Sequence, residues 1–501
     1  MEIDFYKFFY AYMPSVILVV GAIVVLFGNT FAHSFSRSTS LSLSMIFIIS
    51  AVLFCMSIGH IESVSNITHV SEMIILVVGC LFILLTFSKY RFTEFQTPEF
   101  YPLYLFSLSG FLLMVGADNF ILMLLGLEIG SLPLCVLIAF NRRIYGIEAG
   151  IKYFISSALA SIFLLIGILL FYLYSGSFEL NVAMSHYHKF AAYEQISHSI
   201  IALCGIIFLF AGIGFKISLV PWHNWMPDVY EGSNPVIAGF ISIVPKIAGF
   251  AVFASIFGVL FSGDFNDDYI NKILKTLIYI TITLPNIAAL LQKDVKRMLA
   301  FSSISHSGFA LACIYLDSFN TLILYWILFA IANLGSFALL WCNKPKDFHS
   351  RYDYAFERFY GFAKVKPIMA LGISLFMLTL AGIPPLSIFW GKIFIINAAL
   401  SKGEIALSIV MLLNSAIAVC YYLKLPVAMF FKQPITNKDS NSTNVPYRQM
   451  LSYTNNSTLI NYYEDNSTIP IKAVGFISAM LCVCSIFVVS YFFEIIALFE
   501  F

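Results

Sequence analysis

Charged residues are scarce in this sequence, at only 11% of its 501 residues. Soluble domains contain about 25%. Hydrophobic residues make up 60% of the chain, so the composition excludes an ordinary soluble protein and predicts an all-α polytopic membrane protein. One bundle of helices can absorb a chain of this length, and we expect a single transmembrane domain over residues 1–501.

The sequence also lacks the marks of a nucleic-acid-binding, a metal-binding and a secreted protein. No basic stripe with interleaved aromatic residues lies outside the apolar runs, which argues against nucleic acid as a partner. The nine cysteines include no C-x-x-C pair, so we expect no zinc site, no iron–sulfur cluster and no other metal or cofactor bound by this chain. The N-terminal stretch MEIDFYKFFYAYMP is acidic and aromatic, and we expect no cleavable signal peptide.

Apolar runs recur along the whole chain at the length needed to cross a membrane, which is about 20 residues. Scanning for such runs predicts about fourteen transmembrane helices. They lie at about 14–32, 41–59, 73–88, 101–117, 119–140, 149–175, 199–220, 234–261, 271–291, 298–317, 319–342, 366–400, 404–431 and 471–499.

Lysine and arginine are unevenly distributed over the predicted loops. The connections on one face hold sixteen of them, whereas the other face and the termini hold five. Because inner faces are enriched in these residues, both termini are expected on the outer side. The polar insert at 432–465 then falls on the inner face, as a solvated loop or a partner-contact segment. The 51 phenylalanines exceed what hydrophobicity requires, which favours a mitochondrial inner membrane, with both termini toward the intermembrane space, over the alternative of a bacterial plasma membrane.

A few charged residues lie deep inside the predicted spans: Glu128, Lys216, Lys246 and Lys392. A lysine in hydrocarbon costs about 2.5–3.5 kcal/mol and is kept only where a partner or a wet interior receives it. An unpaired carboxylate there would be protonated, so a cation such as Lys216 is the natural partner of Glu128.

These residue types suit proton transfer, because desolvation lowers the pKa of a lysine and a neighbouring carboxylate raises it again. Moving such a carboxylate would make the lysine release or reload its proton. Lys216, Lys246 and Lys392 can thus form a series of sites, connected through water and through histidines such as His306. A purely structural ion pair is the alternative for each lysine.

Four further residues are open to two readings. Lys152 and Lys424 lie near the ends of their spans, where each could either snorkel to the interface or lie on the pathway. His223, in PWHNW, is expected to pack in its loop rather than bind a ligand. His306, in SSISHSG, fits either a pathway or a structural role.

An apolar run with a lysine beside prolines occurs at 205–227 and again at 376–398. Pro221 and Pro227 end the first run, and Pro384 and Pro385 remove backbone donors within the second. Paired broken helices in two halves of a chain indicate an ion pathway built from inverted repeats.

Together these stretches resemble the antiporter-like membrane subunits of respiratory complex I. The resemblance rests on KISLVPWHNWMPDVYEGSNPV, LEIGSLPL, EAGIKYFISSALAS, KRMLAFSSISHSGF, LAGIPPLSIFWGKIF and CYYLKL, which cover about 125 to 425 in order. PDVYEG followed by VPKIAGF is similar to the subunit N branch, called NADH dehydrogenase subunit 2 in mitochondria. The family usually has two prolines near Asn234 and Pro235, where this sequence has one.

The resemblance implies two inverted five-helix repeats, helices four to eight in 101–261 and nine to thirteen in 271–431, with helices seven and twelve broken. Helices one to three then occupy residues 1–100. The polar loop occupies residues 432–470, and the last helix occupies residues 471–501. Among the site residues, Glu128 matches the family's fifth-helix acid and Lys216 its partner. Lys246 matches the connecting lysine, Lys392 the outlet lysine and Lys152 a sixth-helix lysine.

In function, the resemblance implies a proton-translocating subunit of NADH:ubiquinone oxidoreductase that contains no redox centre. NADH, FMN, iron–sulfur clusters and ubiquinone would be bound by partner subunits of the membrane and peripheral arms. Two alternatives remain: a subunit of a multi-subunit sodium/proton antiporter, and a structural spacer of the membrane arm.

Overall fold

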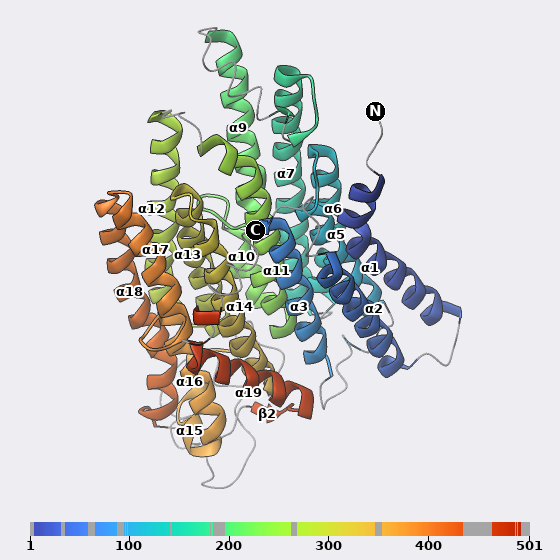
Figure 1. Cartoon of the computed structure of the whole chain (residues 1–501). Helices are drawn as coiled ribbons and strands as arrows, with labels where there is room; N and C mark the ends of the chain where they lie inside the picture. Colours follow the sequence, from blue (N-terminus) through green and yellow to red (C-terminus); the bar gives the residue numbers. More distant parts are fainter. Residues whose placement is uncertain are drawn as a thin grey trace.

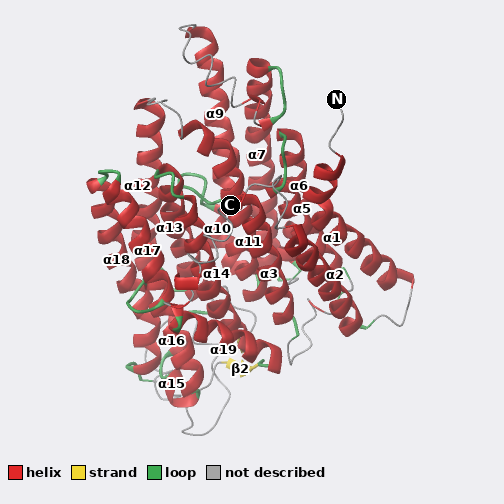
Figure 2. Ribbon diagram, viewed as in Figure 1, coloured by secondary structure: helices red, strands yellow, loops and turns green. Residues whose placement is uncertain are grey.

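The computed structural model describes residues 5–31, 36–58, 66–87, 95, 97, 99–140, 143–180, 182–183, 196–261, 268–345, 353–433, 463–485, 487 and 489–491. Nearly all of these residues are helical (Figures 1 and 2). The first half contains α1 Phe5–Phe31, α2 Arg37–Ile58, α3 Asn66–Leu85, α5 Phe100–Val115, α6 Phe120–Ala139, α7 Ile144–Ser175, α9 Ile196–Lys216, α10 Trp225–Gly232 and α11 Pro235–Phe261. The second half contains α12 Asp268–Leu291, α13 Val295–Tyr315, α14 Phe319–Cys342, η1 Phe356–Phe359, α15 Phe362–Val365, α16 Pro367–Ala381, α17 Ser387–Ser401, α18 Ile405–Phe430 and α19 Ile469–Val483.

The prediction of an all-helical membrane protein is confirmed at this level. In the described ranges, ten helices are long and apolar enough to cross a membrane, and five shorter apolar helices accompany them. Each predicted span overlaps a helix or a pair of helices, but several boundaries differ. The helix expected from 73 begins at Asn66, and the one expected from 298 begins at Val295. Most of the polar insert at 432–465 lies outside the described residues.

Two short strands are the exception to the helical fold. Asn343–Pro345 (β1) pairs antiparallel with Tyr463–Asp465 (β2). This ladder joins the chain after α14 to the chain before α19, and the two helices pack against each other. The C-terminal helix is thereby fixed to the centre of the bundle.

Three helices form the core of the bundle (Figure 1). All of the apolar stretch of α11 is buried, as is 89% of that in α13 and in α14, against 33–39% for α1, α2, α7, α12 and α18. A helix that is apolar on all sides is buried among other helices or in lipid. The outer helices expose apolar side chains instead, such as Ile151, Phe154 and Ile155 of α7. This distribution suits a bundle whose periphery contacts lipid tails.

Side-chain caps fix the starts of three helices around the core. Asn119 accepts from the Leu122 amide at the start of α6, at 2.8 Å. Asp294 accepts from the amides of Lys296 and Arg297 at the start of α13. Asn234 accepts from the Ile237 amide at 2.9 Å, with Pro235 as the first residue of α11. Asparagine and aspartate are favoured caps and proline a favoured first residue, so the missing second proline is replaced by a cap.

Two interruptions divide otherwise continuous membrane helices. The helix α9 ends at Lys216, and a non-helical connection at 217–224 leads to the short helix α10. The helix α16 ends at Ala381, followed by Gly382 at φ 85° and by Pro384 and Pro385 before α17 begins. Glycine accepts the left-handed conformation that commonly ends a helix. Both interruptions leave helix-end carbonyl groups inside the bundle.

Candidate functional site

Lys216 is the last residue of α9 and is only 2% exposed. Its Nζ atom donates to the Ser157 hydroxyl of α7 at 2.8 Å and lies 5.4 Å from the centre of the Tyr153 ring. The break after α9 places the ammonium group at the negative end of that helix, where a cation is favoured. The Lys216 ammonium group is therefore in contact with a neutral hydroxyl group and with the face of an aromatic ring.

Glu128 lies on the side of α6 that faces α7. One glycine precedes it and one follows it, and both lie on the other side of α6, where they let the helix pack closely against α5. A Cβ atom at Gly126 would lie 2.5 Å from the Met114 backbone, and one at Gly130 would lie 3.1 Å from the Phe111 ring. These glycines therefore allow close approach of α5 and α6. Two residues along a helix correspond to about 200°, so Glu128 points away from α5.

Glu128 accepts a hydrogen bond from Ser161, one turn from Ser157 on α7. Within the described residues no ion pair joins Glu128 to Lys216; instead, two serines of α7 stand between them. The carboxylate remains close enough to act on Lys216 electrostatically. Both serines lie in the stretch EAGIKYFISSALAS, and nothing in the pattern marks them as ligands of a charge; their four-residue spacing places both on one face of a helix.

Lys246 is 1% exposed on α11, and all of its polar contacts come from α13. Its Nζ atom donates to the Ser303 carbonyl at 2.6 Å, the Ser303 hydroxyl at 2.8 Å and the Ser307 hydroxyl at 2.9 Å. An ammonium group has three donors, so the three neutral acceptors satisfy it completely. The Tyr230 hydroxyl of α10 joins the same cluster by donating to Ser303 at 3.5 Å.

His306 lies next to this cluster, on the same helix as its serines. Its Nδ1 atom is 2.5 Å from the Tyr325 hydroxyl, and its Nε2 atom is 3.4 Å from the Tyr422 hydroxyl. Both ring nitrogens therefore have a partner that can donate or accept. The histidine therefore lies beside Ser307, which binds Lys246, and 6.5 Å from the Phe309 ring, which Lys392 faces.

Lys392 is 5% exposed, on α17. Its Nζ atom donates to the Ala381 carbonyl at the end of α16, at 3.0 Å, and lies 5.3 Å from the Phe309 ring. The freed carbonyl expected from the proline interruption is thus buried in protein and bound by a lysine.

Four of the five candidates form two polar groups rather than one continuous chain of contacts, and Lys392 binds the Ala381 carbonyl apart from both groups. Glu128 and Lys216 connect through α7, whereas Lys246 and His306 connect along α13. Between the two groups, the residue that follows α9, Ile217, makes an apolar contact with α11 at Gly249. In the described part of the chain, Lys216, Lys246 and Lys392 have no carboxylate at ion-pair distance.

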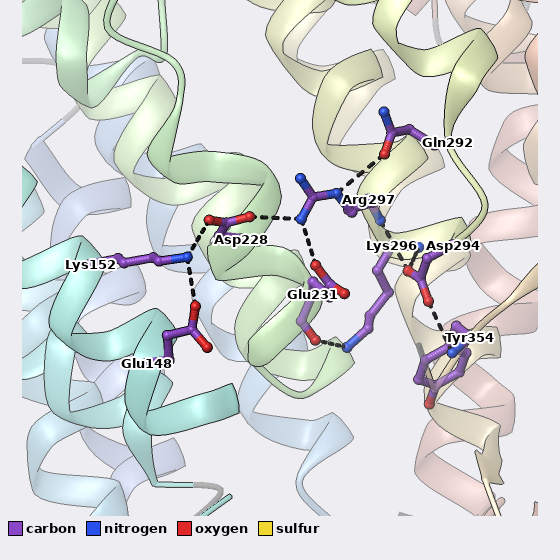
Figure 3. Close-up of polar contacts among 9 residues, drawn as sticks. All are labelled: Glu148, Lys152, Asp228, Glu231, Gln292, Asp294, Lys296, Arg297 and Tyr354. Carbon is purple, nitrogen blue, oxygen red and sulfur yellow. Dashed lines mark hydrogen bonds and ion pairs between the residues drawn. The ribbon is translucent and has the colours of Figure 1, made fainter. Parts of the chain in front are cut away.

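Lys152 belongs to a separate ionic cluster (Figure 3). Its Nζ atom lies 2.7 Å from Asp228 and 2.7 Å from Glu148. Asp228 also pairs with Arg297 at 2.7 Å, and Arg297 pairs with Glu231 at 2.5 Å. The cluster joins α7 and α10 to α13. Lys152 is therefore held by carboxylates, rather than snorkelling freely or contacting the buried lysines.

Lys296 completes this cluster from α13. It is 3% exposed and donates to the carbonyls of Glu231 and Ser233 at the end of α10, at 2.7 and 2.9 Å. Lys296 and Arg297 precede the predicted span at 298–317 and were therefore expected in a loop, whereas the helix begins at Val295. Asp294 as a helix cap, followed by the apolar run, is the signal that would have placed them in the first turn.

Asp228 lies outside the long apolar spans, in α10. Burial raises the pKa of its carboxyl group, but hydrogen bonds from Lys152 and Arg297 outweigh burial and hold the pKa below its ordinary value. A carboxyl group with a lowered pKa contributes stability above its unfolded pKa and loses it as the pH falls through the folded one. Asp228 is therefore charged at neutral pH.

The two remaining candidates have ordinary surroundings. Lys424 binds the Leu290 carbonyl near the end of α12, so it ties α18 to a helix end. His223 lies half-buried in the connection between α9 and α10, as expected for a packing residue. Lys296, Lys392 and Lys424 thus share one role, which is binding the carbonyl end of a neighbouring helix.

A helix bundle with two interrupted membrane helices and buried lysines is an antiporter-like architecture. The family profile described as NADH:quinone oxidoreductase/Mrp antiporter, TM, matches residues 117–418. Among curated proteins, the chain is 43% identical to NADH-quinone oxidoreductase subunit N of Helicobacter acinonychis, over 99% of each chain. It is 40% identical to the subunit N of Campylobacter hominis, over 95% of each. The chain therefore belongs to the NADH:quinone oxidoreductase/Mrp antiporter family, as an antiporter-like subunit of the subunit N type.

Solved structures agree on the fold. A chain of respiratory complex I from Thermus thermophilus matches with a TM-score of 0.72 and 27% identity, covering 93% of this chain and 96% of that one. A chain of the Mrp complex from Dietzia matches with a TM-score of 0.75 at 17% identity, covering 95% of each chain. The second likeness concerns the fold alone.

Proposed function

We propose that this chain is the proton-translocating subunit N of an NADH:quinone oxidoreductase. It would move protons along Glu128, Lys216, Lys246, His306 and Lys392, driven by NADH-to-quinone electron transfer in partner subunits. Those partners would bind NADH, FMN, iron–sulfur clusters and quinone, while this chain contributes no redox centre. The observation that carries the proposal is the set of three lysines deep inside the helices, Lys216, Lys246 and Lys392, which bind hydroxyl and carbonyl groups and have no carboxylate at ion-pair distance among the described residues.

A neutral solvation shell suits a group that must exchange its proton. A lysine locked to a carboxylate is charged in every state, because removing its proton leaves the carboxylate buried and unpaired. A lysine held by hydroxyls and carbonyls can lose its proton while serine hydroxyls reorient to donate to the amine. The Glu128 carboxylate, two serines away from Lys216, supplies the charge whose displacement would switch that lysine.

The layout of the chain is part of the same proposal. The interruptions after Lys216 and before Lys392 support two inverted five-helix repeats, 101–261 and 271–431, within about fourteen spans. The relatives reported above are bacterial, and the mitochondrial location expected from the phenylalanine content has no support among them. We therefore place the chain in a bacterial plasma membrane, with both termini on the outer side and other membrane-arm subunits as its partners.

The test uses the intact complex in sealed vesicles. Glu128→Gln and Lys216→Met should each lower NADH-driven proton translocation severalfold, while complex assembly on native gels stays normal. Glu179→Gln, an exposed carboxylate on the connection after α7, is the matched control and should translocate normally.

If an assembled Lys216→Met complex translocated protons at the wild-type rate, the role of this chain within the complex would be that of a structural spacer. Purification of the tagged chain separates the other alternative. A subunit of an NADH:quinone oxidoreductase copurifies with flavin and iron–sulfur proteins, whereas a subunit of a sodium/proton antiporter does not.

A further inference from the structure

A group of three potential ligands lies between α2 and α3, apart from the residues that bind the buried lysines. Cys55 is on α2, and His69 and Glu72 are on α3. The Cys55 Sγ atom is 3.6 Å from His69 Nδ1 and 3.9 Å from Glu72 Oε2. All three potential ligand atoms lie within 4.8 Å of one another. The His–x–x–Glu spacing places two of them on one helix face.

These separations match the edges of a tetrahedral metal site. Zinc binds sulfur at about 2.3 Å and nitrogen or oxygen at about 2.0–2.2 Å, so two ligand atoms on one tetrahedral ion lie about 3.5 Å apart. The Cys55–His69 distance has that value, and the Cys55–Glu72 distance exceeds it by a few tenths of an ångström. The third edge, between His69 and Glu72, is at most 4.8 Å, which is within the range that a side-chain rotation can close.

The charge of the group also calls for a cation. Glu72 is only 6% exposed, and within the described ranges no lysine or arginine forms an ion pair with it. A buried carboxylate without a cation is costly. A divalent ion with a thiolate, a carboxylate and a neutral imidazole has no net charge, so occupancy would relieve the cost. The thiol proton would leave to solvent on binding.

The types of the three ligand atoms limit which metal ions can bind. Calcium and magnesium take oxygen ligands, which a thiol and an imidazole do not provide. Sulfur, nitrogen and oxygen together suit zinc and its neighbours in the first transition row. Three protein ligands leave a fourth position open for water, as in zinc sites that exchange ligands.

The site is also within reach of the aqueous phase. Cys55 lies three residues before the end of α2, and His69 three residues after the start of α3, which is about 4.5 Å along each helix. Gly116, at the end of α5, closes the opposite side, since a Cβ atom there would lie 3.1 Å from Glu72 Oε1. An ion at this place would tie the ends of α2 and α3 together beside α5.

We propose that Cys55, His69 and Glu72 bind a single divalent ion of the zinc type. The absence of a C-x-x-C pair predicted no metal site, but these ligands come from two helices and only one is a cysteine. Packing of α2 on α3 creates the group, which is why spacing along the sequence did not reveal it.

The test titrates the full-length purified chain with Co(II), as a spectroscopic substitute for Zn(II), and counts bound Zn(II) after dialysis. The wild-type chain should bind one equivalent and show a thiolate-to-cobalt charge-transfer band. Cys55→Ser should lose the band and bind at least tenfold more weakly. Cys420→Ser, which removes an exposed thiol on α18, is the matched control and should bind like the wild type.

Two further variants keep the test decisive if Cys55→Ser does not fold. Glu72→Gln and His69→Gln, each checked by size-exclusion chromatography, should keep the thiolate band while weakening binding at least tenfold. The proposal is overturned if the wild-type chain shows no saturable binding, if Cys55→Ser retains the band, or if both α3 variants bind as tightly as the wild type. None of these outcomes bears on proton translocation.

Discussion

The bundle contains two groups of cations that differ in what holds them. In the cluster of α7, α10 and α13, Lys152 and Arg297 are each paired with two carboxylates. In the interior, Lys216, Lys246 and Lys392 contact hydroxyls, carbonyls and aromatic rings. Paired charges are fixed and connect helices, whereas charges solvated by neutral dipoles can be given up. The difference separates residues that hold the bundle together from residues fit to carry protons.

Among the substitutions that test this comparison, replacing an interior lysine should have the largest effect. Lys246→Met removes a buried ammonium group without leaving an unpaired charge, and serine hydroxyls can bond to each other afterwards. NADH-driven proton translocation should fall at least tenfold, while the thermal stability of the complex stays within about 1 kcal/mol of the wild type. Vesicle pumping assays and thermal inactivation curves measure the two quantities.

The matched variant is Lys402→Met, which changes an exposed lysine at the end of α17 and should alter neither quantity. Normal translocation by Lys246→Met would remove this lysine from the group of exchangeable charges. A large loss of stability would instead place it with the structural cations.

The opposite result is expected from Arg297→Met in the paired cluster. The change removes the cation that Asp228 and Glu231 share, although Asp228 keeps its pair with Lys152. Because Arg297 and Asp228 are 24% and 25% exposed, the loss should cost about 1–3 kcal/mol, between the cost of an exposed pair and that of a buried one. The complex should inactivate at a lower temperature and assemble in smaller amounts. Translocation per assembled complex should remain near that of the wild type.

Lys293→Met, an exposed lysine four residues earlier, provides the control and should have no effect on stability. Full stability of Arg297→Met would show that the cluster does not hold α10 to α13. A loss of translocation without a loss of stability would mean that the two groups of cations are not separate in role.

A smaller effect is expected from the neutral acceptors themselves. Ser157→Ala removes the hydroxyl that receives Lys216, and a water molecule can take its place at modest cost. Translocation should fall only about threefold, because a bridging water is nearly as good as a direct hydrogen bond. Ser156→Ala, its neighbour, whose hydroxyl binds the Lys152 carbonyl, should translocate like the wild type. Equal rates for the two variants would argue that the Ser157 hydroxyl has no part in proton transfer.

The sequence predicted the lysines and prolines inside the membrane spans better than the ordinary polar groups that contact them. A lysine inside an apolar run is easily recognised, and a proline in a membrane helix predicts an interruption. Lys216, Lys392 and both helix breaks could therefore be predicted from the sequence. The groups that receive these lysines are ordinary serines and carbonyls, which no pattern distinguishes. Only the packing of α7 on α9 and of α11 on α13 identifies them.

Helix boundaries account for the charged residues that were overlooked. Glu72 and Lys296 fell just outside the predicted spans, because hydropathy drops at a polar first turn although the helix continues. Both proved to be buried, at 6% and 3% exposure. A burial cost calculated over predicted spans alone therefore misses the charges that the tertiary structure encloses at the ends of helices.

Lys392 binds the main chain at Ala381, not a side chain, and this affects what genetics can reveal. Any residue placed at position 381 presents the same carbonyl group, so a scan of single substitutions would report only on the packing of the buried Ala381 side chain. The acceptor would go undetected although the lysine depends on it. Replacing the amide linkage by an ester, which weakens the carbonyl as an acceptor, would detect it.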